Sequence, residues 1–380
     1  MRISTRPTAI EPRTRSHILR SLPATFTEKA PMYCTTASES TASHDINPEW
    51  KLVVIGRGSF ATVSILSGRP VAFKHIIFSG RTPELKAEFE ALRCIYDSCD
   101  TDSFFAIPRP LAYYDPAVST SFCSPDSPPI SKVWSRARRP LVAEDDFKAL
   151  KLDSAAYAMD QVLPLPLSTA LLIRRLFYPP GQDMATVPSL CRLYFGKVID
   201  MTSAGGRPSR FFNSSNFPLD VTRYSRILEA ARVDDYPTVD DIVCGMGEML
   251  GHLHCRGGYD GRDVEFVMGG ASFSGIAMNI IDFNQVCHLL ASADVEINTF
   301  FPKMRPWLRK KNEIHQLVEA FFSNDPYYPR PRPADRLYQK FCLGYLEAHL
   351  KESKEAAELA EVFLRAIEAE QAKRDSAVRD

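Results

Sequence analysis

The 380-residue chain lacks a net charge, because its 46 lysines and arginines are balanced by 46 aspartates and glutamates. A neutral chain has no general electrostatic attraction to nucleic acid or to an anionic membrane surface, so neither partner is expected. The sequence also lacks any uninterrupted apolar run near the length of about 18 residues that a membrane-spanning helix needs. A small molecule or another protein is therefore the expected partner.

Paired cysteine motifs are also missing. The nine cysteines are scattered and no CxxC pair occurs, so neither a disulfide framework nor a zinc ribbon is expected. One group of candidate metal ligands consists of His252, His254, Cys255, Cys287 and His288, but its spacing matches no standard zinc site. We therefore expect no zinc. Unpaired thiols are typical of a reducing compartment, which favours the cytoplasm.

Residues 1–46 contain few periodic apolar residues and many Ser, Thr, Arg and Pro. This composition predicts a disordered N-terminal arm. The first 20 residues hold five arginines and one acid, Glu11, so a mitochondrial presequence is the alternative to a cytoplasmic location. A clean amphipathic stripe, which such a presequence needs, is absent from this stretch.

Residues 47–162 predict several strands around one helix. The stretches "WKLVVIG", "ATVSIL" and "RPVAFKHII" predict three strands, and "PELKAEFEALRCIY" has apolar residues at helical spacing. Two further strands are predicted by "SFFAIPRPLAYY" and "AAYAMDQV", with a Ser/Pro-rich insertion near 115–145 between them. We expect a small lobe built on an antiparallel sheet.

Residues 163–350 predict a larger, mainly helical lobe. Its predicted helices are "STALLIRRLFY", "PSLCRLYFGKVI" at 188–199, and "TVDDIVCGMGEMLGHLHCRG", which Thr238 caps. Two short strands, "VEFVMG" and "AMNIIDF", follow, and residues 351–380 predict a C-terminal helix that docks on the rest. The order of elements predicts an α+β fold with two lobes and a cleft between them.

The first candidate site residues lie in "GRGSFATV", where Gly56, Gly58 and Ala61 follow a predicted strand. Small residues allow backbone N–H groups to approach phosphate oxygens closely. The stretch resembles the glycine-rich loop of protein kinases, GxGxxGxV. The alternative is a plain hairpin with glycines at its turn.

Lys74 ends "VAFK", which resembles the kinase strand motif whose lysine reaches ATP phosphates. Its alternative is a surface lysine that extends along apolar groups. A kinase lysine needs a glutamate from the next helix, and Glu88 lies 14 residues further on. The alternative for Glu88 is an exposed position on an amphipathic helix. Met159 and Gln161 in "YAMDQV" would then lie at the back of an adenine pocket and along the adenine edge.

The catalytic loop of protein kinases has the form HRDxxxxN, and the stretch "YDGRDVEFVM" can be aligned with it in two registers. Asp263 uses the "RD" pair but has Met268 five residues later, which cannot bind a cation. Asp260 has Glu265 five residues later, directly before an apolar strand, and we choose this register. Asp282 in "IIDFN" then matches a metal-binding aspartate.

Together these motifs resemble those of protein kinases. The resemblance implies a two-lobed protein-kinase-like fold that uses ATP and Mg²⁺. Lys74, held by Glu88, would steady the phosphates, and Asp282 with Glu265 would hold the cation. Asp260 would accept the proton of a hydroxyl on a small-molecule or protein acceptor.

A second resemblance rests on "YAMDQVLPLP", "LCRLYFGK", "DGRDVEFVMG", "IIDFNQV" and "NDPYYPRP". These blocks are similar to an uncharacterised fungal family whose members are labelled zinc-finger-protein-like, over roughly residues 50–350. The resemblance implies a filamentous-fungal origin and a distant protein-kinase-like or aminoglycoside-phosphotransferase-like fold.

The sequence departs from active kinases at three positions. Gly258 and Tyr259 precede Asp260 where kinases have a histidine and an arginine, Glu265 replaces an asparagine, and Asn284 replaces a glycine. Two functions therefore stay open. One is a phosphotransferase. The other is a pseudokinase scaffold that acts through protein contacts, and either could serve a secondary-metabolite pathway.

Overall fold

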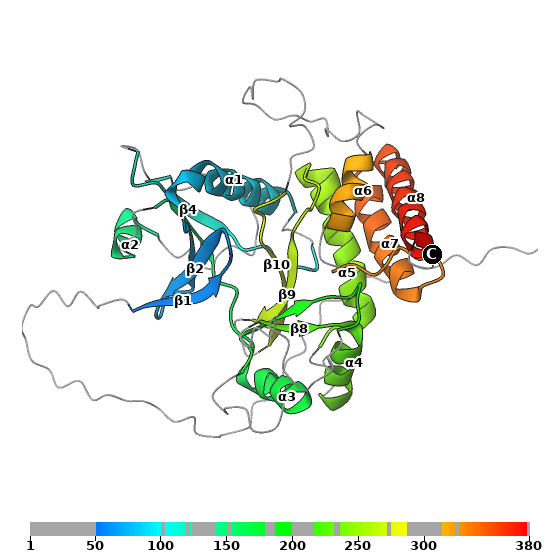
Figure 1. Ribbon diagram of the computed structural model, residues 1–380, viewed down its shortest axis with the longest axis horizontal. Helices are drawn as coiled ribbons and strands as arrows, with labels where there is room; N and C mark the ends of the chain where they lie inside the picture. Colours follow the sequence, from blue (N-terminus) through cyan, green and yellow to red (C-terminus); the bar gives the residue numbers. More distant parts are fainter. Residues whose placement is uncertain are drawn as a thin grey trace, which may run out of the picture. The chain divides into compact units, whose positions relative to one another are not determined.

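The computed structural model describes most of the chain from residue 51 onwards (Figure 1). The described residues are 51–99, 103–118, 122–123, 142–150, 154–178, 187–199, 216–231, 236–271, 275–286, 314–323 and 327–377. They belong to one compact unit, Glu49–Asp380. The predicted N-terminal arm and most of the predicted Ser/Pro-rich insertion lie outside the described residues.

The first sheet is antiparallel, as the sequence predicts for this part of the chain. Its strands follow the order β1-β2-β3-β6-β4-β5. They are β1 (Leu52–Arg57), β2 (Ala61–Leu66), β3 (Val71–Ile76), β4 (Pro110–Tyr114), β5 (Phe122–Cys123) and β6 (Ala156–Asp160). The central strands β3 and β6 pair directly, and Val71 lies opposite Asp160, which is 89 residues later in the chain.

The two faces of this sheet are covered by two helices. α1 (Thr82–Cys99) buries Leu85, Phe89 and Leu92 at intervals of three to four residues, which is the spacing of one helix face. On the other face, Phe147 of α2 (Glu144–Ala149) packs on Phe73 and Tyr114. Of these two helices, α1 carries a predicted site residue, Glu88.

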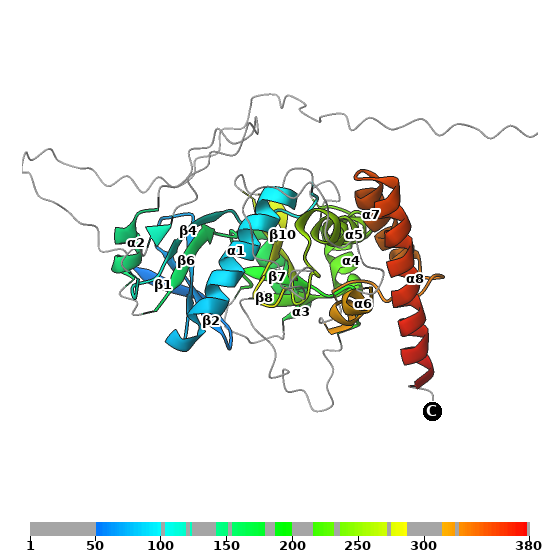
Figure 2. The same ribbon diagram turned by 90° about the horizontal axis from the view of Figure 1, so that it is seen from above.

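The helices of the remaining chain include several that pack side by side. They are α3 (Leu167–Phe177), α4 (Val221–Ala230), α5 (Val239–His252), α6 (Ile314–Ser323), α7 (Arg336–Leu350) and α8 (Lys354–Ala377). Thr238 and Asp241 form the capping box that begins α5, and a π turn, Leu253–Gly257, continues it. α7 packs between α5 and α8 (Figures 1 and 2).

A second sheet lies among these helices and corrects one prediction. Its order is β10-β9-β7-β8, with β7 (Leu190–Leu193), β8 (Asn216–Leu219), β9 (Glu265–Gly270) and β10 (Ile276–Ile281). The helix predicted at 188–199 is wrong, because β7 occupies this segment. Cys191 and Leu193 are buried while Arg192 between them is partly exposed, which is the alternation of a strand. The region 163–350, which the sequence predicts to be mainly helical, therefore contains a four-stranded sheet among its helices.

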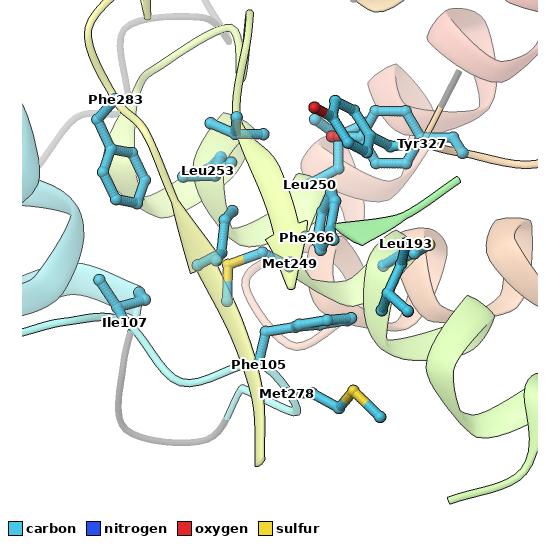
Figure 3. Close-up of a cluster of buried hydrophobic side chains, with 14 of the residues drawn as sticks. Phe105, Ile107, Leu193, Met249, Leu250, Leu253, Phe266, Met278, Phe283 and Tyr327 are labelled. Carbon is cyan, nitrogen blue, oxygen red and sulfur yellow. The ribbon is translucent and has the colours of Figure 1, made fainter. Parts of the chain in front are cut away.

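The segment 103–107 joins the two sheets. The Ala106 N–H donates to the carbonyl of Met278, and the Ile280 N–H donates to the carbonyl of Ala106. Phe105 inserts its ring into the core between Phe266 and Met278 (Figure 3), 4.7 Å from the Phe266 ring centroid. These contacts fix the end of α1 relative to β10. Within the described residues, no helix has the length and apolarity needed to cross a membrane.

Glycines allow α5 and α7 to approach closely. A Cβ atom at Gly247 would clash with the carbonyl oxygen of Phe341, and one at Gly344 would clash with that of Cys244. Neither clash involves a flexible side chain, so the helix backbones would have to separate.

We expect Gly247→Ala to lower the free energy of unfolding by at least about 2 kcal/mol, because the strain exceeds the gain in helix propensity. Urea denaturation followed by circular dichroism measures this change. Gly80→Ala is the control, since nothing lies within 4 Å of a Cβ there. Equal unfolding midpoints for the two variants would contradict the close packing of α5 on α7.

Candidate functional site

The structure brings Lys74, Glu88 and Asp282 together from three separate elements. The Lys74 ammonium on β3 lies 2.5 Å from Glu88 Oε1 on α1 and 2.9 Å from Asp282 Oδ1, which follows β10. Lys74 is 7% exposed and Glu88 is 2% exposed. Lys74 is therefore not a surface lysine, and Glu88 is not at an exposed position of its helix.

Burial and charge act in opposite directions on this group. Burial alone would lower the pKa of Lys74, but the two carboxylates outweigh it and hold that pKa above its usual value. Burial raises the pKa of Glu88, Lys74 opposes the increase, and Asp282 adds to it. With both carboxylates ionised, the three residues carry one net negative charge.

Asp282 reaches Lys74 because the chain turns sharply after β10. Its φ angle is 65°, a left-handed conformation that aspartate tolerates better than most residues. The next residue, Phe283, is buried in the core (Figure 3). The turn therefore directs one side chain towards the lysine and the next into the core.

Asp260 lies in the loop between the π turn and β9, and its carboxylate is turned towards Arg262. Asp260 Oδ1 accepts a hydrogen bond of 3.0 Å from the Arg262 backbone N–H, and Oδ2 lies 3.6 Å from Arg262 Nε. Glycines with positive φ, Gly258 and Gly261, flank this loop position. Asp260 is 5% exposed, and its contacts with Arg262 lie within the same loop.

His254 supports the same loop, which sequence reasoning missed. Its Nδ1 lies 2.7 Å from the Tyr345 hydroxyl, and its Nε2 lies 3.3 Å from the Asp260 carbonyl oxygen. Because a carbonyl only accepts, we assign the proton to Nε2, so that Nδ1 accepts from Tyr345. Burial, with the nearby His349, lowers the pKa of His254 to about 3 and keeps its ring neutral.

Glu265 is paired with Arg192, a residue that sequence reasoning also missed. Glu265 begins β9 opposite Ile281, which places it beside Asp282 at the end of β10. Its carboxylate lies 2.5 Å from the Arg192 guanidinium of β7. Burial raises the pKa of Glu265, Arg192 opposes the increase, and Asp282 adds to it. The helix predicted at 188–199 concealed the strand face from which Arg192 reaches Glu265.

The predicted phosphate loop is a hairpin turn between β1 and β2. Gly56 pairs with Val63, and the Gly58 N–H donates to the carbonyl of Ala61 at 2.9 Å. Phe60 at the tip is buried and its ring centroid lies 5.9 Å from Lys74 Nζ. The loop therefore lies over the lysine, while the Gly58 N–H is used within the turn.

The predicted adenine-contacting residues lie at the end of β6. Met159 pairs with Ala72 of β3 and is partly buried. The Gln161 N–H donates to the carbonyl of Pro70 at 3.1 Å. Gln161 thus uses its backbone donor inside the protein, whereas Met159 lies on the strand next to the lysine.

Among the described residues, no three His, Cys, Asp or Glu side chains gather in a way that could hold a metal ion. Cys287 and His288 of the candidate Cys/His group lie outside the described residues. Asp282 and Glu265 are hard-oxygen donors suited to Mg²⁺, but each is already paired with a cationic side chain.

Comparison with known proteins gives one match. The model of a domain family of unknown function, described as "Zinc finger protein", matches residues 278–360. This segment includes most of β10, together with Asp282, α6 and α7. No curated protein and no solved structure matches the chain. The match supports the predicted similarity to an uncharacterised family with a zinc-finger label, while the fungal origin stays a prediction.

We expect His254 to make stability depend on pH. The folded pKa of about 3 lies below the ordinary value of 6.5, so the unfolded chain binds the proton first. The contribution is fully present above pH 6.5 and is lost towards pH 3, at about 1.4 kcal/mol per pH unit within that window. Urea denaturation at several pH values measures it.

His254→Gln removes this contribution, and its side-chain amide keeps an N–H donor for the Asp260 carbonyl. The difference in unfolding free energy between wild type and this variant should therefore shrink as pH falls from 6.5 to 4, a range set by the His254 shift. His315→Gln on the exposed face of α6 is the control and should follow the wild type. A constant difference for His254→Gln would exclude the assigned neutral ring.

Proposed function

We propose that this chain is an ATP- and Mg²⁺-dependent phosphotransferase with a protein-kinase-like fold, acting on a hydroxyl of a small molecule or a protein. The observation that carries the proposal is the buried group of Lys74, Glu88 and Asp282. Its members lie 14 and 208 residues from the lysine along the chain, yet each carboxylate is within hydrogen-bond distance of Lys74 Nζ. A lysine on the third strand, a glutamate on the next helix and an aspartate after a later strand are the phosphate and metal residues of kinases.

The arrangement of the first sheet supports the same proposal. The helix that carries Glu88 lies between β3 and β4 in sequence, and the strand order β1-β2-β3-β6-β4 places Lys74 in the centre. The hairpin between β1 and β2 lies over this lysine through Phe60. A small lobe of this form would place the phosphates of a nucleotide between the hairpin and Lys74.

ATP would supply the transferable phosphoryl group and leave as ADP, and Mg²⁺ would supply much of the charge neutralisation. Lys74 would donate to the phosphate oxygens, and Asp282 would turn from the lysine towards the cation. Asp260 would orient the acceptor hydroxyl and take its proton, with the Arg262 guanidinium 3.6 Å from its carboxylate. Glu88 would keep Lys74 in place while Asp282 moves.

Arg192 offers a reason why Glu265 is compatible with this chemistry. A glutamate in place of a neutral amide adds one negative charge near Asp282, and the Arg192 guanidinium at 2.5 Å compensates it. The pair as a whole is close to neutral, as the amide would be. Glu265 would join the cation site only after releasing Arg192, so Asp282 is the principal metal ligand in this proposal.

A second candidate function is a kinase-like scaffold that acts through protein contacts. It is favoured by three groups that already have partners inside the protein. The Gly58 N–H donates to Ala61, the Gln161 N–H donates to Pro70, and Glu265 is held by Arg192. If these interactions persist in solution, the chain would bind nucleotide weakly or not at all.

Thermal unfolding with and without millimolar ATP and Mg²⁺ separates the two functions. We expect wild type to be stabilised, by about 2.7 kcal/mol when the free ligand is at 100 times its Kd. Lys74→Met should abolish the shift, because it removes the ammonium that meets the phosphates. Lys148→Met is the control, since this lysine is exposed on α2. An unchanged wild-type melting temperature would reject the phosphotransferase and favour the scaffold.

Asp260→Asn tests the chemical step. With water as acceptor, we expect the rate of ATP hydrolysis to fall about 100-fold, because the amide cannot take a proton. The thermal shift with ATP and Mg²⁺ should stay, since Asp260 makes no proposed contact with the nucleotide. Hydrolysis equal to that of wild type would remove Asp260 from the proposed mechanism.

A further inference from the structure

We propose that Tyr157 is a positioning residue of this site, whose hydroxyl holds Glu88 and thereby fixes the Lys74 ammonium in the position that meets phosphate. The role in nucleotide binding rests on the function proposed above, whereas the control of Lys74 does not.

The inference begins with one oxygen atom that has two donors. Glu88 Oε1 accepts from Lys74 Nζ at 2.5 Å and from the Tyr157 hydroxyl at 3.1 Å. Glu88 Oε2 is buried and has no hydrogen-bond partner within the described part of the chain. The orientation of the carboxylate therefore depends on the two donors at Oε1. Of these, Tyr157 is the one that carries no competing carboxylate partner.

The sheet explains why Tyr157 is at this position. Lys74 of β3 and Tyr157 of β6 lie directly opposite each other in the antiparallel pair, so their side chains share a face. α1 covers that face, and the Phe89 ring next to Glu88 packs 5.6 Å from the Tyr157 ring. The aromatic contact places the hydroxyl beside the carboxylate.

The Lys74 ammonium is attracted by two carboxylates, and Tyr157 holds only one of them, Glu88. Glu88 and Asp282 both contact its ammonium, and Asp282 is the more exposed of the two, with 30% of its side chain accessible. Burial and the nearby Glu88 raise the pKa of Tyr157 well above its usual value, so its hydroxyl stays protonated and donates. Without this donor, Glu88 is less fixed and Lys74 is free to follow Asp282 away from the buried position.

Tyr113 provides a matched control within the same sheet. It lies directly opposite Tyr157 on β4, so Lys74, Tyr157 and Tyr113 form one row across three strands. Its ring packs 5.7 Å from the same Phe89 ring. The Tyr113 hydroxyl, however, has no hydrogen-bond partner among the described residues. The two tyrosines thus have similar packing and differ in the bond to Glu88.

The experiment measures the reactivity of Lys74 without any nucleotide. Full-length wild type, Tyr157→Phe and Tyr113→Phe are treated briefly with acetic anhydride, and acetylation of Lys74 is measured by peptide mass spectrometry. We expect labelling to rise at least about threefold in Tyr157→Phe, because Lys74 is less tightly held. Tyr113→Phe should match wild type. Equal labelling of the two variants overturns the proposal.

A second background separates the hydroxyl's effect on Glu88 from a general loosening of the fold. In Glu88→Leu, which has no acceptor oxygen for either donor, the additional Tyr157→Phe change should alter Lys74 labelling by less than about 1.5-fold, since the bond from Tyr157 to residue 88 is already removed. A full threefold rise in this background would show that the hydroxyl acts elsewhere and would overturn the proposal.

Calorimetric titration with ATP and Mg²⁺ then tests the link to binding. We expect Tyr157→Phe to weaken the affinity about tenfold and Tyr113→Phe to leave it within about twofold of wild type. If wild type binds but Tyr157→Phe binds equally well, the positioning role in binding is rejected. If wild type itself does not bind, the phosphotransferase proposal fails, and the labelling result still decides whether Tyr157 controls Lys74.

Discussion

The structure depends on the pairing of one buried ammonium. Lys74 is 7% exposed, and an unpaired charge at that depth would be strongly destabilising. Its two partners, Glu88 and Asp282, come from a helix and from the turn after a strand of the other sheet. Pairing this lysine therefore requires that β3, α1 and the end of β10 occupy fixed relative positions.

Apolar packing supplies the stability that such a buried ionic group does not. Phe89 of α1 lies against the two tyrosines of β4 and β6, and this contact sets the rotation of the helix that carries Glu88. The segment 103–107 continues from α1 and pairs through Ala106 with β10, while Phe105 fills the core beneath it. The Glu88 side and the Asp282 side of the lysine are thus connected through one packed segment.

Charge compensation recurs around this group. Arg192 compensates Glu265, and Arg262 lies beside Asp260. His254 stays neutral and donates to the Asp260 carbonyl, which supports this loop. These contacts hold Glu265 and Asp260 in fixed positions, and they are compatible with either a catalytic or a scaffolding role.

The sequence by itself determined the local elements where one period was clear. Short apolar runs predicted β2, β3, β9 and β10. Helical spacing of apolar residues predicted α1, and the Thr238 cap marked the start of α5. The sequence also suggested Lys74, Glu88 and Asp282 through their spacing. The helix predicted at 188–199 was wrong, because the four residues of β7 carry too little periodicity to separate a strand from a helix. Only the tertiary structure decided which side chains meet. Tyr157, Arg192 and His254 act through strand register and helix packing between segments far apart in the chain, and no local pattern records those distances.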